Sequence, residues 1–166
     1  MAKAAVITVS DSCSRGERED LSGPAVAARL SELGFEVVAR VLVADDEAAI
    51  RSALIGAAEA APLVVTTGGT GIAARDVTPE ATRAVCERVL DGLSERMRAV
   101  GTCKTPLAAL SRAVCGTRAT SLIVNLPGSP KGAVESLDAI AHLIPHAIDL
   151  LAGKTAHTPP PAVPKS

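Results

Sequence analysis

Residues 63–80 read LVVTTGGTGIAARDVTPE and join an apolar run, a glycine-rich segment and the first turn of a helix. The apolar and β-branched residues at 63–67 predict a buried strand, and Thr78-Pro79 predicts a helix with Thr78 as its N-cap. A strand that passes through glycines into a helix is typical of open α/β sheets, which bind ligands beyond the carboxyl ends of their strands. The stretch therefore predicts both a fold class and the place of a site.

Strands and helices alternate along the rest of the chain. Nearly continuous apolar strands between amphipathic helices predict a parallel sheet that is covered on both faces. The expected fold class is three-layer α/β/α, with a mostly parallel central sheet and a small strand pair near 112–126. One domain over 1–153 and a Pro-rich mobile tail over 154–166 complete the expected organisation. We expect strands at 4–10, 36–43, 112–115 and 121–126, and helices at 24–33, 47–60, 93–100 and 130–151, the last kinked at Pro145.

The composition narrows the class of partners. The 166 residues include 17 basic and 18 acidic side chains, so no basic field attracts a nucleic acid or an anionic membrane. Phe35 is the only aromatic residue, which excludes a platform for stacking successive bases. The four cysteines form no CxxC pair, and no apolar run approaches the roughly 20 residues that span a bilayer. We therefore expect a cytoplasmic protein that binds neither nucleic acid nor membrane.

The glycine-rich segment Thr66 to Gly71 combines backbone N–H groups with threonine hydroxyls, the donors that an oxyanion needs. The segment from Gly69 to Ala74 formally matches a dinucleotide fingerprint. In that fingerprint, however, the helix opens within the glycines, whereas Thr78-Pro79 places it later. A Walker P-loop would need a Gly-Lys pair that this segment lacks. The segment is therefore interpreted as an anion-binding loop of another kind.

Two acidic positions are candidates for catalysis or metal binding. Asp76 lies close to the expected anion site, where a carboxylate is repulsive unless a divalent cation uses it, so we expect it to bind Mg²⁺. Asp45, Asp46 and Glu47 follow the strand at 36–43. One acid suffices to cap the next helix, which leaves at least one of them free. The pattern does not decide between Asp45 and Asp46.

Further helix starts are marked by proline at Ser129-Pro130 and at Ser22-Gly23-Pro24. Together with Thr78-Pro79 they predict three open helix N-termini near one edge of the sheet, which favours a ligand with several anionic groups. His142 and His146 are spaced as metal ligands could be, but they lie opposite the apolar stripe of their helix, and we interpret them as a solvated face. The cysteines are interpreted as structural.

Four segments in this order and spacing resemble the molybdopterin adenylyltransferases, the MogA/MoaB-like family that includes the G domain of gephyrin. The segments are VITVSDSCSRGEREDLSGP, TTGGTGIAARDVTPEAT, LSRAVCG and SLIVNLPGSP. The resemblance implies that the terminal phosphate of molybdopterin attacks the α-phosphate of ATP, with Mg²⁺ as cofactor, to give adenylylated molybdopterin and pyrophosphate. It also implies a homotrimer and transient contact with other proteins of cofactor biosynthesis.

The resemblance also assigns residues. It implies Asp45 and Asp76 as catalytic and metal-binding acids, although Ala44-Asp45-Asp46 stands where relatives often have Pro-Asp-Glu, so Asp46 stays an alternative. Arg15 and Lys104 are further candidates for phosphate contacts from their loop positions. Two other functions stay open, a catalytically silent molybdopterin-binding scaffold and a regulatory nucleotide-binding domain. The expected substrate-binding residues are Ser10, Asp11, Gly68, Gly69, Thr70, Gly71, Arg75, Ser111, Asn125, Pro127, Gly128 and Ser129.

Overall fold

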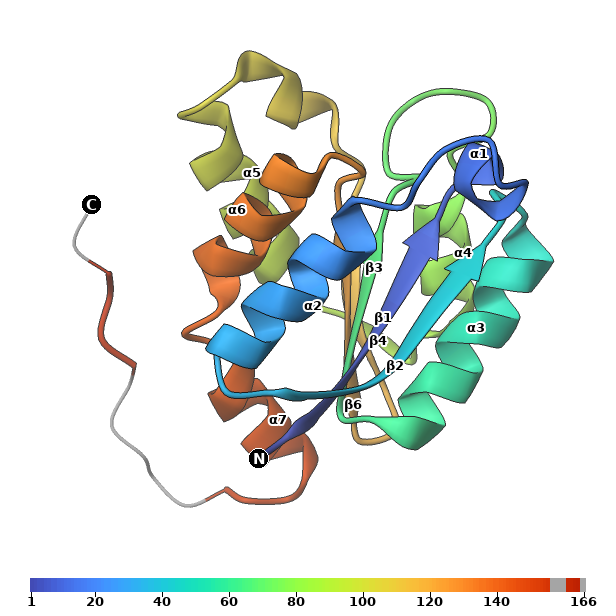
Figure 1. Cartoon of the computed structure of the whole chain (residues 1–166). Helices are drawn as coiled ribbons and strands as arrows, with labels where there is room; N and C mark the ends of the chain where they lie inside the picture. The colour runs from blue at the N-terminus through green and yellow to red at the C-terminus, as the bar shows by residue number, and fades with distance from the viewer. Residues whose placement is uncertain (156–160, 165–166) are drawn as a thin grey trace.

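The computed structural model describes residues 1–155 and 161–164, and its centre is a six-stranded sheet with the order β2-β1-β3-β6-β5-β4 (Figure 1). The first four of these strands are parallel, β5 pairs with β6 in antiparallel fashion, and β4 pairs with β5 in antiparallel fashion. The predicted mostly parallel sheet is therefore confirmed. The strands are β1 (Lys3–Val9), β2 (Glu36–Val43), β3 (Leu63–Thr67), β4 (Arg88–Val89), β5 (Cys115–Arg118) and β6 (Ser121–Leu126).

Helices cover both faces of the sheet, which gives the predicted three layers (Figure 1). Alternate residues of β1 point to opposite faces of the sheet. Ala4 and Val6 pack in the core cluster of one face, and Ala5 and Ile7 pack in the core cluster of the other. This is the period of two of a strand that is buried on both faces. On one side lie α2 (Ser22–Glu32), α5 (Asp91–Thr102), α6 (Pro130–Ile140) and α7 (Ile144–Leu151); on the other lie α3 (Glu47–Ala60) and α4 (Thr78–Val85).

The four parallel strands end at one edge of the sheet. Val9 pairs with Val43, and Thr67 pairs with both Thr8 and Leu126, so the strand ends lie level with one another. From β1 the chain passes through α2 to β2, and then through α3 to β3 on the other side of β1. The two crossovers leave in opposite directions, which opens a crevice at the ends of β1 and β3. The segments that follow the strands all begin here, including the short helix α1 (Asp11–Ser14), where a loop was expected.

The expected strand pair is present, but its first strand lies three residues later than predicted. β5 occupies Cys115–Arg118, and the turn falls at Ala119 and Thr120. Position 116 of β5 has no room for a side chain, because a Cβ there would lie 2.7 Å from the Arg88 carbonyl oxygen of β4, and it is occupied by glycine. Of the predicted strand at 112–115 only Cys115 belongs to β5, because the Arg112 N–H donates to the Thr70 carbonyl and the Val114 N–H donates to the Asn125 side chain. These tertiary contacts are not contained in a local pattern.

The expected helix over 130–151 is two helices. α6 ends at Ile140 and α7 begins at Ile144, and Pro145 stands in the first turn of α7. Proline has no N–H for the hydrogen bond of a continuous helix, and its ring clashes with the preceding turn, so the apolar stripe continues across a break rather than a kink. The chain around 93–100 is α5, followed by the 3-10 helix η1 (Pro106–Leu110).

The predicted mobile tail over 154–166 falls in part on residues outside the described ranges, and it stays a prediction. Within the described part of the chain, no helix is long and apolar enough to cross a membrane.

The backbone of Ala119 provides a test of the β5–β6 turn. Its φ is +49°, a left-handed conformation that costs a residue with a Cβ about 1 kcal/mol. We expect Ala119→Gly to raise the free energy of unfolding in urea by up to about 1 kcal/mol. The same change at exposed Ala99 in α5 should lower it by about 1 kcal/mol. A loss of stability at both positions would contradict the proposed strain.

Candidate active site

Two glycines carry the chain away from the end of β3. Gly68 and Gly69 have φ values of +93° and +68°, in the left-handed region that favours glycine. A Cβ on Gly68 would clash with the carbonyl oxygen of Val9, and its N–H donates to the Leu126 carbonyl at 3.1 Å. The loop therefore lies directly against the ends of β1 and β6, and only glycine fits there.

Thr78 fastens the same loop from the other side. Its hydroxyl donates to the Gly68 carbonyl at 2.9 Å, and its N–H donates to the Gly69 carbonyl at 3.1 Å. The prediction that Thr78 is the N-cap was wrong, because the residue is the first of α4 and its hydroxyl makes this tertiary contact instead. Thr78 thus joins the start of α4 to the glycines.

Arg112 holds the remainder of the glycine loop, a role that sequence analysis missed. Its guanidinium donates to the carbonyls of Gly71 and Asp76, both at 2.7 Å, and pairs with the carboxylate of Glu80. Its own N–H donates to the Thr70 carbonyl at 2.8 Å. The pKa of Glu80 is lowered mainly by the hydrogen bond from Arg112. The available signal was a cation inside the otherwise apolar segment LSRAVCG.

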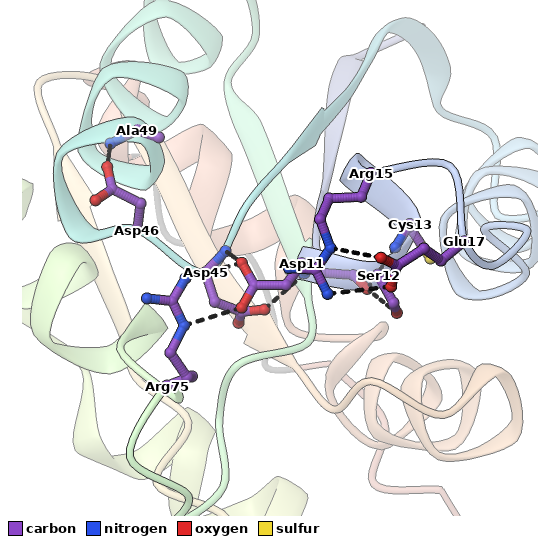
Figure 2. A network of polar contacts seen from close by, with 10 residues as sticks. Asp11, Ser12, Cys13, Arg15, Glu17, Asp45, Asp46, Ala49 and Arg75 are labelled. Carbon is purple, nitrogen blue, oxygen red and sulfur yellow. Dashed lines mark hydrogen bonds and ion pairs between the residues drawn. The ribbon is translucent and has the colours of Figure 1, made fainter.

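Asp11 and Asp45 tie the ends of β1 and β2 together (Figure 2). The Asp11 N–H donates to Asp45 Oδ2 at 2.9 Å, and the Asp45 N–H donates to Asp11 Oδ1 at 3.0 Å. Arg75 from the glycine loop donates to both oxygens of Asp11, each at 2.9 Å. This hydrogen-bonded pair lowers the pKa of Asp11. Three predicted site residues from separate segments therefore lie in one network.

Asp45 and Asp46 have different roles. Asp46 caps α3, accepting a hydrogen bond from the Ala49 N–H at 2.9 Å, as Figure 2 shows. Asp45 is half-buried and faces the glycine loop, where its Oδ1 lies 3.2 Å from the position that a Cβ of Gly69 would take. Burial, and then the charges of Asp11 and Asp76, raise the pKa of Asp45. The acid left free by capping is Asp45.

Asp76 lies beside Gly71 and lines the same cavity as Asp45. Its Oδ2 accepts from the Ala73 N–H at 3.0 Å and would lie 2.8 Å from a Cβ on Gly71. Oδ1 of Asp76 and Oδ1 of Asp45 make no hydrogen bond within residues 1–155 and 161–164. Two carboxylates with a free oxygen each fit Mg²⁺, which in nucleotide sites takes its other ligands from phosphates and water.

The described residues contain no group of three or more His, Cys, Asp or Glu side chains that could hold a metal alone. His142 and His146 therefore form no such site with their neighbours. The acid pair fits a cation that a phosphate substrate shares.

Two cavities meet beside the start of α6, and both are bordered by Gly128 and Ser129. Ser129 caps α6, since its hydroxyl accepts from the Gly132 N–H at 3.1 Å. The first cavity, which we name the acidic cavity, is lined by residues that include Ser10, Asp20, Asp45, Gly68, Gly69 and Asp76. The second, the apolar cavity, measures about 360 Å³, and its lining includes Met97, Val100, Leu107, Leu110, Ala113 and Pro127.

The other predicted site residues divide between these cavities and the interior. Ser10 caps α1 by accepting from the Cys13 N–H at 3.2 Å, and Ser111 borders the apolar cavity together with Thr70, Gly71 and Lys104. Arg15 instead pairs with Glu17 at 2.9 Å on the surface.

Sequence analysis also missed Asp20, which borders the acidic cavity. Its carboxylate accepts from the Thr8 hydroxyl at 2.8 Å and from the Gly23 N–H at 3.0 Å. These bonds tie the loop before α2 to the end of β1. No local pattern singles out Asp20 among the charged residues around it.

Asn125 has a fully buried side chain that links four segments. Its Oδ1 accepts from the Val114 N–H at 3.1 Å, and its Nδ2 donates to the hydroxyls of Thr66 and Thr82 at 3.1 and 2.9 Å. Asn125 was predicted to bind substrate. Asn125 borders the apolar cavity, and its amide joins β6 to β3, to α4 and to the segment before β5; its binding to substrate stays a prediction.

Comparisons with known proteins show which family this chain is similar to. Residues 5–146 match a family model described as a probable molybdopterin binding domain. Molybdopterin adenylyltransferase of Helicobacter pylori strain J99 is 45% identical over 155 residues, covering 89% of this chain and 86% of that protein. The Escherichia coli K12 protein of the same name is 37% identical, covering 95% and 89%. The structure of the molybdopterin biosynthesis enzyme MoaB from Thermus thermophilus superposes with a TM-score of 0.87 and 50% identity, covering 93% and 98%.

Removing the Asn125 amide tests its structural role. Asn125→Ala leaves the Val114 N–H buried and unpaired, so we expect the free energy of unfolding to fall by about 2–3 kcal/mol. Thr82→Val removes one partner only and should cost about 1 kcal/mol. Chemical denaturation measures both values. An Asn125→Ala protein as stable as the wild type would contradict the linking role.

The raised pKa of Asp45 gives a second test. The folded protein binds this proton more tightly than the unfolded chain, so the contribution to stability is present at low pH and is lost as the pH rises through the raised pKa. We expect Asp45→Asn to melt at or above the wild-type temperature at neutral pH. The difference in melting temperature should shrink as the pH is lowered toward 3.8, the ordinary pKa of an aspartate. Asp46→Asn is the matched control, because asparagine also caps helices well. A lower melting temperature for Asp45→Asn at neutral pH would disprove the electrostatic cost.

Proposed function

We propose a function from the premise that the chain belongs to the family of probable molybdopterin binding domains: it is a molybdopterin adenylyltransferase of molybdenum cofactor biosynthesis. The observation that carries the proposal is the meeting of two cavities at Gly128 and Ser129, one lined by acids and one by apolar side chains. A transfer between two large substrates needs two binding sites whose reacting ends touch. The acidic cavity suits the phosphates of ATP with their cation, and the apolar cavity suits the pterin.

The proposed reaction is an in-line transfer at phosphorus. A terminal phosphate oxygen of molybdopterin bonds to the α-phosphorus of ATP, the bond from that phosphorus to the bridging oxygen breaks, and pyrophosphate leaves with the electron pair. Such reactions depend mainly on positioning and on neutralising charge. The free N–H groups of the glycine loop and the open first turn of α6 supply donors at the meeting point of the cavities.

Asp45 and Asp76 are the proposed ligands of Mg²⁺. When bound, the cation would neutralise the charge that develops on the phosphate oxygens. Asp11 and Arg75 act on Asp45 indirectly, because the Asp11 backbone holds Asp45 Oδ2 and the Arg75 guanidinium fixes Asp11. Oδ1 of Asp45 is thereby kept toward the glycine loop.

The assembly and the location of the protein are proposals from the family resemblance. We propose a homotrimer that works in the cytoplasm and passes its product on through transient contacts with other proteins of the pathway. The intact acid pair favours an active enzyme over a silent binding protein, since a scaffold has no use for two unneutralised carboxylates at a phosphate site.

Pyrophosphate release tests the reaction directly. Purified protein with molybdopterin, ATP and MgCl₂ should release pyrophosphate, and EDTA should stop the release until Mg²⁺ is restored. Asp45→Asn and Asp76→Asn should each lower kcat by about 100-fold or more, because the charge on the transferred group is no longer neutralised. Molybdopterin binding should change little.

Asp46→Asn is again the control and should keep its turnover. Molybdopterin binding without ATP consumption would disprove the enzymatic function. A larger loss in Asp46→Asn than in Asp45→Asn would disprove only the assignment of the acid.

A further inference from the structure

Glu135 is the only acid among the residues that line the apolar cavity, all of which lie in the described chain. It belongs to α6, where Gly132, Glu135 and Ser136 border the cavity together. Residues three and four apart lie on one face of a helix, so this face of α6 forms one wall. A single carboxylate in a mostly apolar wall is the kind of polar group that orients a ligand.

The two oxygens of Glu135 have different surroundings. Oε1 lies 3.4 Å from the Lys104 ammonium and 3.9 Å from that of Lys131. Oε2 accepts no hydrogen bond from any described residue. Lys131 is 88% exposed and lies outside the cavity lining, whereas Glu135 is only 26% exposed. The carboxylate is therefore held on one side while its other oxygen stays available.

The rest of the lining restricts how a flat ring could be recognised. Phe35, the only aromatic residue, is buried in the core directly before β2 and borders neither cavity. Aliphatic side chains such as Met97 and Leu110 can cover the faces of a ring, but they do not fix its rotation in the plane. That orientation must come from hydrogen bonds at the ring's edge.

A carboxylate accepts best from two parallel N–H groups. The pterin ring, a 2-amino-4-oxopyrimidine fused to a pyrazine, presents such a pair at N3 and the 2-amino group. Adenine presents its 6-amino group beside an acceptor, N1, and so offers this edge only one donor. The two oxygens of Glu135 have enough lone pairs for a pterin edge as well as the lysines.

We propose that Glu135 is the specificity-determining residue for the pterin, accepting hydrogen bonds from its N3–H and 2-amino group. This assignment rests on the proposed function, and it sets the direction of the substrate in the apolar cavity. The pterin end lies against α6 at Glu135, and the phosphate end points toward Gly128 and Ser129, where the acidic cavity begins.

The experiment compares two simple ring compounds, pterin and lumazine, which has a carbonyl in place of the 2-amino group. Binding to the full chain is followed by titration calorimetry and by NMR chemical shifts. We expect pterin to bind wild type about tenfold or more tightly than lumazine, and Glu135→Gln to lose that preference. Molybdopterin should bind Glu135→Gln roughly 10- to 100-fold more weakly, with ATP affinity unchanged and kcat at saturation within a few fold.

Lys131→Gln is the matched control, since it removes an ion pair from the same carboxylate but lies outside the cavity lining. It should bind both rings as wild type does. Glu135→Asp keeps the charge but withdraws it from the cavity by one methylene, and it should give an intermediate preference. Melting temperatures of all variants confirm folding.

The outcomes separate this inference from the proposed function. A Glu135→Gln protein that still prefers pterin would overturn the assignment even if pyrophosphate release is normal. Equal weakening of ATP and pterin binding would also overturn it, because it would indicate a general disturbance of the cavities. If wild type prefers pterin through Glu135 but releases no pyrophosphate, the assignment holds and the proposed reaction fails.

Discussion

The chain leaves β3 through Gly68 and Gly69, whose left-handed backbone lies against the carbonyl of Val9. Because no side chain intervenes, the carbonyls of both glycines reach Thr78, and the Gly68 N–H reaches Leu126. This one close approach brings the ends of three strands and the start of α4 together. A Cβ at Gly68 would push the loop outward and separate Asp45 from Asp76, so the site depends on the absence of two side chains.

Only some of the acids around that turn are neutralised by a basic side chain. Arg75 pairs with the carboxylate of Asp11. Arg112 pairs with the carboxylate of Glu80 and donates hydrogen bonds to two loop carbonyls. Asp45 has no cation of its own among the described residues, and its burial beside two other acids raises its pKa. A carboxylate held at such a cost is typical of a functional position, where stability is given up for an electrostatic environment that a substrate or cation completes.

The scarcity of aromatic residues has a structural counterpart. Phe35 lies in the core, and the apolar cavity is lined by aliphatic residues of α5, of η1 and of the loop that follows β6. Glu135 is the only acidic residue in the lining of that cavity. A ring can therefore be enclosed by aliphatic contacts and oriented at its edge, which separates the task of burying the ligand from the task of identifying it.

Local patterns were enough for the elements whose signals are local. The strand at 63–67 and the helix at 47–60 have the predicted bounds, and the glycine loop lies at the predicted edge. The sequence also determined which segments contain the site, since parallel strands bring their carboxyl ends to one edge. Tertiary structure alone decided that Asp46 caps α3 while Asp45 faces the cavity, and that Arg112 reaches Gly71 and Asp76. The cap on α3 is itself a local contact, but the contacts of Asp45 with Asp11 and of Arg112 with the glycine loop join residues at least 34 positions apart. Their partners are defined only when the strands have assembled, so no local periodicity could reveal them.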